Sequence, residues 1–329
     1  MTISRAALAV AITVGILTAP LVTKAQPATK VWRIGYLGYG YPTEAKDVEA
    51  FRQRLRDLGY VEGKNLVIES RLAESRDERL PALAAELVGL KVDVITAYGN
   101  GTIAALKQAT RTIPIVMIIA GDPVGAGLVS SLAHPGGNVT GLSSRLGEGL
   151  SAKSLELLTQ TAPGMTRVGV LTVPNSPNHG RYLREITTAG QRTGVAVLRF
   201  EVRERDDIEG AFAALTKARP QGLIVLPHPV MLTNQTLIVE LAARHRLPAM
   251  YPWREFTERG GLMAYSPNRT EMYRRSATFV DKILRGAKPG DLPIEQPTKF
   301  ELVINAKTAK ALGLTIPPSL MLRADEILE

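Results

Sequence analysis

The sequence predicts an α/β protein of two similar lobes, each a parallel sheet flanked by helices. Its 329 residues exceed what one compact core usually covers. Hydrophobic residues make up 45% and charged residues 22% of the chain, which is enough apolar material for two cores. Both halves repeat one order of apolar segments, loops and helical stretches, and this alternation is typical of parallel sheets wound by helices.

The first half is predicted to hold strands separated by helices. Residues 31–37 are apolar and run into a Gly/Tyr/Pro loop, the pattern of a buried strand before a turn. Residues 65–69 alternate after a glycine-containing turn, and 79–90 have the spacing of an amphipathic helix. In chain order we expect strands at 31–37, 65–69, 92–96 and from 113, with helices over about 44–58, over 79–90 and after the loop 98–101.

The second half repeats this order. A helix is expected after each of the loops 174–177 and 227–229, and Asp206 or Asp207 can cap the helix between them. The expected strands lie at 167–171, 195–200, 222–226 and 247–251. Because each strand is followed by a helix, both lobes are predicted to be Rossmann-like.

Three segments are expected to cross between the lobes: the turn-rich 134–142, the glycine-rich 260–265, and 295–302 ahead of a helix at 305–312. The long helix over 269–284 is assigned back to lobe one. A hinge of three segments permits closure without loss of either core. The expected boundaries are 1–25 for a signal peptide, 26–141 plus 263–296 for lobe one, and 142–262 plus 297–329 for lobe two.

The N-terminal segment has the pattern of an export signal. Arg5 precedes an apolar run over 6–22, and the small residues Thr23 and Ala25 suit cleavage after Ala25. A membrane anchor is the alternative, but the run is short for a span and Pro20 interrupts it. The chain has no cysteine, which excludes a lipid-attached N-terminal cysteine and disulfides. We therefore expect a soluble periplasmic protein.

The charge gives little support to nucleic-acid binding. The formal charge is +9, and removal of Arg5 and Lys24 with the signal leaves 9 − 2 = +7. The cations lie in scattered pairs, as on a solvated helix face. Aromatic residues are 5% of the chain and do not interleave with a basic stripe.

Signals for catalysis, metals and cofactors are weak. The four histidines are far apart and lack paired ligand spacing. Ser143-Ser144 lacks the nucleophile elbow, and 121–127 is neither a dinucleotide fingerprint nor a phosphate-binding loop. We expect no catalytic residue, no metal and no cofactor.

Several runs together resemble a known family, the ABC-transporter substrate-binding proteins of the branch that includes tryptophan- and tyrosine-binding members. They are 58–65 (Leu-Gly-Tyr-Val-Glu-Gly-Lys-Asn), 121–129 (Gly-Asp-Pro-Val-Gly-Ala-Gly-Leu-Val), 134–141 (His-Pro-Gly-Gly-Asn-Val-Thr-Gly), 296–305 (Gln-Pro-Thr-Lys-Phe-Glu-Leu-Val-Ile-Asn) and 311–314 (Ala-Leu-Gly-Leu). The resemblance covers nearly the whole mature chain. It implies a type I periplasmic-binding fold that captures a small solute and presents it to a membrane permease.

Parallel α/β sheets bind ligands beyond the carboxyl ends of their strands. The loops at these ends are rich in Gly, Asn, Ser and Tyr, which allow close backbone approach and provide hydrogen bonds and flat walls. The candidate ligand-binding residues are Tyr39, Gly40, Tyr98, Asn100, Gly101, Thr102, Asp122, Asn175, Ser176, His228, Tyr251, Trp253 and Tyr265.

Each candidate also has a structural interpretation. Asn100, Gly101 and Thr102 open a helix whose free N–H groups suit a carboxylate. A plain helix cap is the commoner role of an asparagine such as Asn100, and it is compatible with ligand binding. Asp122 suits an ammonium group, or fixes the turn before Pro123. Five aromatic residues are candidates for the wall: Tyr39, Tyr98, Tyr251, Trp253 and Tyr265. Of these, Tyr251 and Trp253 lie at a strand end, where core packing is the commoner role of an aromatic residue, and a lone loop histidine such as His228 is usually structural or solvated.

The sequence therefore predicts a monomeric, non-enzymatic solute-binding component of an ABC importer, with an amino acid, including an aromatic one, as candidate ligand. The ligand would close the lobes and the permease would recognise the closed form. Two alternatives stay open. One is a ligand-sensing protein that docks on a membrane receptor. The other is an exported hydrolase that depends on His228 or Asp122.

Overall fold

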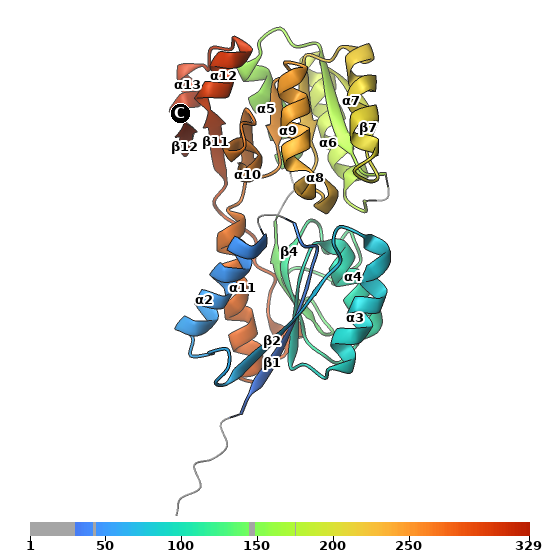
Figure 1. The fold of residues 1–329 in the computed structure, drawn as a ribbon, viewed down its shortest axis with the longest axis vertical. Helices are drawn as coiled ribbons and strands as arrows, with labels where there is room; N and C mark the ends of the chain where they lie inside the picture. The colour runs from blue at the N-terminus through green and yellow to red at the C-terminus, as the bar shows by residue number, and fades with distance from the viewer. Residues whose placement is uncertain (1–29, 42–43, 145–148, 175) are drawn as a thin grey trace, which may run out of the picture. The chain divides into compact units, whose positions relative to one another are not determined.

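A computed structural model describes residues 30–41, 44–144, 149–174 and 176–329 (Figure 1). The predicted export signal at 1–25 and the candidate Asn175 lie outside the described residues. Residues Trp32–Glu329 form one compact unit that holds both sheets. Within the described residues, no helix combines the length and apolar character needed to cross a bilayer.

The first lobe is built on a five-stranded sheet of order β2-β1-β3-β4-β5, in which every pairing is parallel. The central strands β3 and β4 are buried at every position, as expected when helices cover both faces of a parallel sheet. The strands are β1 (Trp32–Gly38), β2 (Leu66–Leu72), β3 (Val94–Tyr98), β4 (Ile115–Ala120) and β5 (Val139–Ser143).

Helices cover both faces of this sheet (Figure 1). On one side α2 (Glu44–Asp57) packs against α11 (Arg269–Leu284), which also contacts β4 and β5. On the other side α3 (Leu80–Gly89), preceded by the 3₁₀ turn η1 (Asp77–Arg79), packs against α4 (Asn100–Ala109). The first lobe is therefore completed by a helix that follows most of the second lobe in the chain.

The second lobe is built on a seven-stranded sheet of order β12-β11-β10-β9-β8-β6-β7. Its strands are β6 (Arg167–Thr172), β7 (Ala196–Glu201), β8 (Gly222–Val225), β9 (Ala249–Tyr251), β10 (Met263–Ser266), β11 (Glu301–Asn305) and β12 (Glu326–Leu328). The pairings are parallel except between β10 and β11. This exception follows from the path of the chain, because β10 runs out toward the first lobe and β11 returns from it.

The sheet order corrects the expected lobe boundaries in two places. β10 pairs with β9 and β11, so residues 263–266 belong to the second sheet, and the chain crosses after Ser266. β5 pairs with β4, so the first sheet extends past residue 141 to Ser143. The third crossing passes beside β5, where Glu295 forms a parallel bridge with Leu142. Both corrections have one cause: strand pairing continues into segments whose glycine-rich sequence is typical of linkers.

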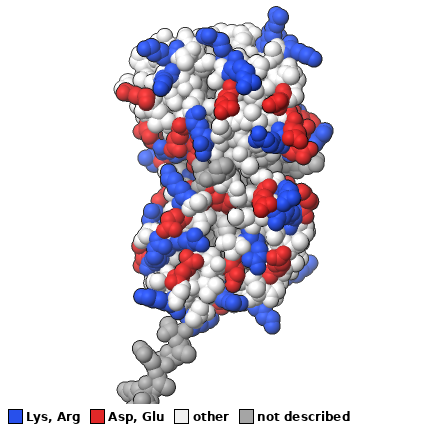
Figure 2. All heavy atoms as spheres, in the orientation of Figure 1, with Lys and Arg blue, Asp and Glu red and all other residues white. Residues whose placement is uncertain are grey.

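Helices also cover the second sheet. The helices α5 (Leu150–Thr161) and α6 (His179–Thr193) pack together, as do α7 (Asp207–Ala218) and α9 (Gln235–Arg244). The remaining helical elements are α8 (Pro229–Thr233), α10 (Arg254–Glu258), α12 (Ala306–Leu312), α13 (Pro318–Met321) and the 3₁₀ turn η2 (Pro289–Asp291). On the face drawn in Figure 2, cationic and anionic side chains are mixed over both lobes.

A buried arginine joins the two lobes. Arg269, the first residue of α11, is 2% exposed. Its Nε donates to Asp47 Oδ2 of α2 at 2.8 Å, and its Nη2 lies 3.0 Å from Glu255 Oε1 of α10 in the second lobe. The guanidinium also lies over two aromatic rings, 4.7 Å from the Tyr41 centroid and 5.8 Å from that of Trp253.

The charge of Arg269 is maintained by its neighbours. Burial acts against the cation, but Tyr41, Glu255 and Asp47 more than offset it and raise the pKa of Arg269 above its ordinary range. Burial raises the pKa of Glu255, and the nearby guanidinium opposes that rise. A buried cation without such partners would be strongly destabilising.

We expect Asp47→Ala to lower the free energy of unfolding by about 3–5 kcal/mol, because it leaves a buried guanidinium with one carboxylate fewer. Chemical denaturation of the ligand-free protein measures this. Glu49→Ala on the same helix is the matched control, since its pair with Arg56 is solvent-exposed and should change stability by less than about 0.5 kcal/mol. Equal effects of the two substitutions would contradict the role given to Arg269.

Candidate functional site

A cavity of about 200 Å³ lies where the carboxyl ends of strands from both sheets meet. Tyr39, Gly99, Gly121 and Ser144 line it directly after β1, β3, β4 and β5 of the first lobe. The second lobe contributes Val173 after β6, with Pro227, His228 and Trp253 from the loops that follow β8 and β9. This is the position at which parallel α/β sheets bind ligands.

The N terminus of α4 forms one wall. Gly99 has φ 88°, a left-handed conformation that turns the chain from β3 into the helix. Asn100 Oδ1 accepts a hydrogen bond from Gly121 N at 2.9 Å, whereas Asn100 Nδ2 is buried and has no partner among the described residues. Thr102 Oγ1 donates to the carbonyls of Tyr98 and Gly99, so Thr102 is part of the helix start and not of the cavity lining.

Tyr39 lies against the first turn of this helix. A Cβ at position 101 would lie 2.6 Å from the Tyr39 hydroxyl, so Gly101 allows the ring to approach the helix. Burial raises the pKa of Tyr39, and the neighbouring Asp77, to which its hydroxyl is hydrogen-bonded, raises it further. Tyr39 therefore presents a fixed, neutral ring to the cavity.

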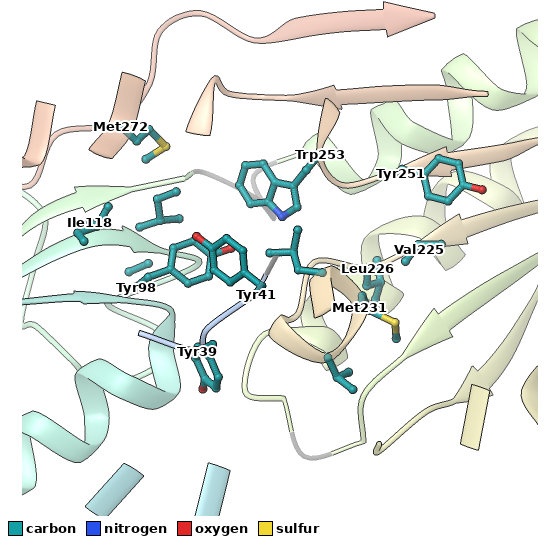
Figure 3. Close-up of a cluster of buried hydrophobic side chains, with 14 of the residues drawn as sticks. Tyr39, Tyr41, Tyr98, Ile118, Val225, Leu226, Met231, Tyr251, Trp253 and Met272 are labelled. Atoms are coloured by element: carbon teal, nitrogen blue, oxygen red, sulfur yellow. The ribbon is translucent and has the colours of Figure 1, made fainter. Parts of the chain in front are cut away.

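A tyrosine cluster supports the floor of the cavity (Figure 3). The ring of Tyr98 lies 5.4 Å from Tyr41 and 6.2 Å from Tyr273, measured between centroids. The hydroxyls of Tyr41 and Tyr273 are 2.7 Å apart, and Tyr273 also contacts the hydroxyl of Tyr36. Tyr36 in turn donates to the carboxylate of Glu44. Two rings thus pack against Tyr98, and a hydrogen bond joins those two rings to each other.

Trp253 forms the opposing wall from the second lobe. Its side chain is 2% exposed, and its indole Nε1 has no hydrogen-bond partner among the described residues. In Figure 3 this nitrogen is on the edge of the ring that faces the middle of the labelled cluster. Trp253 is therefore both a flat apolar surface and a buried donor.

Two histidines lie side by side in the second lobe, with ring centroids 5.7 Å apart. His179 Nδ1 accepts from Val173 N at 2.8 Å, so its Nε2 carries the proton and donates to Pro227 O at 3.1 Å. His228 Nδ1 accepts from Val230 N at 3.3 Å, which leaves the proton on its Nε2. Burial lowers the pKa of His179 to about 3, with His228 as a second cause, and lowers the pKa of His228 to about 4.

The two lobes touch at the rim of the cavity. Asp122, next to Gly121, forms a salt bridge with Arg181 of α6, and its Oδ1 accepts from Gly125 N at 2.9 Å. A Cβ at position 121 would lie 2.3 Å from Asn178 Nδ2, so Gly121 lets β4 approach the start of α6. On another part of the rim the hydroxyls of Ser75 and Thr233 are hydrogen-bonded.

The structure brings seven of the candidate residues together and separates five others from the cavity. Those lining it are Tyr39, Tyr98, Asn100, Gly101, Ser176, His228 and Trp253. Those not lining it are Gly40, Thr102, Asp122, Tyr251 and Tyr265. Ligand contact by the seven stays a prediction.

The five residues outside the cavity have other partners. Gly40 N donates to the Glu44 carboxylate, and Asp122 fixes its turn and binds Arg181. Tyr251 stacks on Phe256 with centroids 5.0 Å apart, and Tyr265 packs on Phe300 at 5.8 Å. Both tyrosines line a separate space of about 20 Å³ inside the second lobe. Asp122 is therefore already neutralised, which argues against the expected ammonium contact.

Sequence reasoning missed several lining residues. Ser144 directly follows β5, so a search of strand ends would have included it if β5 had been predicted. The turn-rich pattern of 134–142 predicted a linker there instead. Asn178 and Tyr182 enter from the start of α6, and Asp77 enters from the turn η1. Their contribution depends on how helices sit over the sheet edge, which the local sequence does not specify.

The family model described as "ABC transporter substrate binding protein" matches residues 41–328. The chain belongs to this family. A tyrosine-binding protein of Clostridioides difficile (strain R20291) is 26% identical over 274 residues, which cover 83% of this chain and 78% of that protein.

Solved structures agree with this assignment. A conserved domain protein from Vibrio cholerae O1 biovar El Tor is 26% identical with a TM-score of 0.85, covering 91% of this chain and 100% of that one. A domain from Streptococcus pneumonia in complex with L-Trp is 24% identical, also with a TM-score of 0.85 and with coverage of 91% and 100%. The fold is that of the type I periplasmic-binding proteins, as the sequence predicted.

The histidine pair predicts a pH-dependent stability. Below about pH 6.5 the unfolded chain protonates both imidazoles while the folded protein keeps them neutral, so the free energy of unfolding falls as the pH drops from about 6.5 toward 4. Each histidine contributes up to about 1.4 kcal/mol per pH unit to this loss.

His228→Asn should remove one of these contributions, because asparagine can still cap α8 and does not titrate. We expect the difference in free energy of unfolding between wild type and His228→Asn to change by about 1.4 kcal/mol per pH unit between pH 6 and 5. Denaturation curves of the ligand-free proteins at several pH values measure it. A difference that is independent of pH would refute the neutral state assigned to His228.

Proposed function

We propose that this protein is the solute-binding component of an ABC importer, located in the periplasm, and that it captures an amino acid between its lobes by hinge closure. The observation that carries the proposal is the cavity shared by both lobes. A ligand that contacts both halves stabilises the closed arrangement, and a membrane permease can then recognise that arrangement.

The size of the cavity supports a small solute. Its volume is about 200 Å³. Drug-sized ligands usually occupy ~300–1,000 Å³. A single amino acid is consistent with this space.

The aromatic walls support an aromatic side chain on the solute. Tyr39, Tyr98 and Trp253 present rings to the cavity from both lobes. Micromolar capture needs about −8 kcal/mol, and a helix terminus supplies only about 0.3–1 kcal/mol. Burial of an aromatic group between these rings can supply much of the remainder. The tyrosine-binding relative and the neighbour that holds L-Trp support the same ligand class.

Capture without chemical turnover is supported by the state of the polar side chains. Both ring nitrogens of His179 are hydrogen-bonded to the backbone, and one of His228 is. The serine of the lining at the end of β5, Ser144, donates to the backbone carbonyl of Ala120. A general base needs a free, well-placed lone pair beside a nucleophile, and these groups do not provide one.

A thermal-shift screen of the mature protein against amino acids, purines and other small solutes tests the proposal. A ligand at about 100 times its dissociation constant adds about 2.7 kcal/mol of stability and raises the melting temperature by a few degrees. We expect L-tyrosine or L-tryptophan to produce this shift, with isothermal titration calorimetry on each hit. If a different solute class binds, the amino-acid assignment fails and the capture role stands. If no small solute binds, the capture role fails as well.

The Asp122–Arg181 pair at the rim should favour closure without contacting the solute. We expect Asp122→Ala to weaken the measured affinity only up to about fivefold, since partly exposed ion pairs contribute about 0.2–1 kcal/mol. Calorimetry on Asp122→Ala, Arg181→Ala and the double variant isolates the coupling between the two residues. A loss of binding beyond about a hundredfold in Asp122→Ala would instead indicate direct ligand contact.

A further inference from the structure

Among the described residues, two buried side-chain donors of the cavity on which the proposed function rests have no hydrogen-bond partner. Asn100 Nδ2 of the first lobe and Trp253 Nε1 of the second are both buried, line the same cavity and have no partner among the described residues. A buried donor without a partner costs about 1–3 kcal/mol. Two such donors on facing walls indicate that the solute supplies acceptors to both.

Two further features of the lining favour an acceptor. The start of α4 faces the cavity, and within the described part of the chain no side chain caps it by a hydrogen bond. Its N–H groups and the positive end of its dipole favour a negative group. His228 offers Nε2–H as an additional donor, because its Nδ1 is occupied by Val230 N.

The lining contains no lysine or arginine among the described residues, so the negative group would be held by neutral donors. Asp77 is the acidic residue of the lining, and its hydrogen bond with Tyr39 sets it beside that ring. Asp77 is solvent-exposed, which limits what it can contribute to an ammonium group. Hydrogen bonds from neutral donors to a charged acceptor are roughly twice as strong as those between neutral groups.

We propose that the solute carries a carboxylate as its anchoring group and that this carboxylate bridges the lobes, accepting hydrogen bonds from Asn100 Nδ2 and Trp253 Nε1. Trp253 is then a specificity residue through its indole N–H as well as through its ring. Because one donor comes from each lobe, both can be satisfied by one small solute only when the lobes are closed. The required ligand class is an aromatic carboxylate, with or without an amino group.

Calorimetry with matched ligands tests this inference. The probes are L-tyrosine and L-tryptophan, their carboxamides, the decarboxylated amines tyramine and tryptamine, and the deaminated acids 3-(4-hydroxyphenyl)propionate and indole-3-propionate. We expect the carboxamides and amines to bind at least about 10- to 100-fold more weakly than the amino acids, because they lack the anionic acceptor. The deaminated acids should retain most of the affinity.

Two substitutions remove one donor each. Trp253→Phe retains an aromatic wall without the N–H, and Asn100→Asp retains the acceptor for Gly121 N while replacing the donor by a carboxylate. We expect affinity for the acids to fall about 10- to 100-fold in Trp253→Phe and by more in Asn100→Asp, where like charges oppose. Tyr251→Phe, in the second-lobe core away from the cavity, is the control and should bind as wild type does.

Thermal unfolding without ligand checks that each variant is folded, and the two substitutions report on the inference independently. Amines or amides that bind as tightly as the acids, or acid affinity within twofold of wild type in both variants, would overturn the carboxylate bridge and leave the capture role intact. Absence of binding by every probe to the wild-type protein would overturn both proposals.

Discussion

The arrangement of this protein depends on one buried cation. Arg269 begins the helix that crosses back to the first lobe, and it binds a carboxylate from each side: Asp47 on α2 and Glu255 on α10. Its guanidinium also lies over the rings of Tyr41 and Trp253. Since Tyr41 supports Tyr98, the same cation holds in place the floor and one wall of the cavity. Moving Arg269 would disturb the lobe junction and the binding surface together.

The distribution of polar partners explains the character of the cavity. The carboxylates of Glu44, Asp47 and Glu255 are engaged with tyrosines or Arg269, and Asp122 is engaged with Arg181. His179 is occupied on both nitrogens. These charged groups are thus used in holding the protein together, and apart from Asp77 the described lining of the cavity is uncharged and rich in aromatic rings. Such a surface binds by burial and directed hydrogen bonds more than by charge.

Periodicity and strand-end rules predicted the fold closely, and the site in part. The helix expected over 269–284 coincides with α11, because its apolar spacing and the cap at Asn268 are local features. Tyr39, Asn100 and Trp253 were predicted from the strand ends, which local apolar runs also indicate, and all three line the cavity. Tyr251 and Tyr265 were misplaced because a residue inside a strand faces one side or the other of the sheet, and only the packed helices show which side is core. Asp122 was expected to contact an ammonium group of the ligand, but it pairs with Arg181. Local sequence patterns do not indicate a partner so distant in the chain.

The position of α11 in the chain has a consequence for biosynthesis. This helix packs on α2, β4 and β5, so the core of the first lobe is completed by residues 269–284, after most of the second lobe has been made. A nascent polypeptide that has emerged only to Leu262 lacks both this helix and Arg269, and its early strands remain without part of their cover. Contacts between segments so distant in sequence delay completion of the first lobe until residues 269–284 are available. Until α11 is made, the growing chain cannot bury the face of the first sheet that this helix covers.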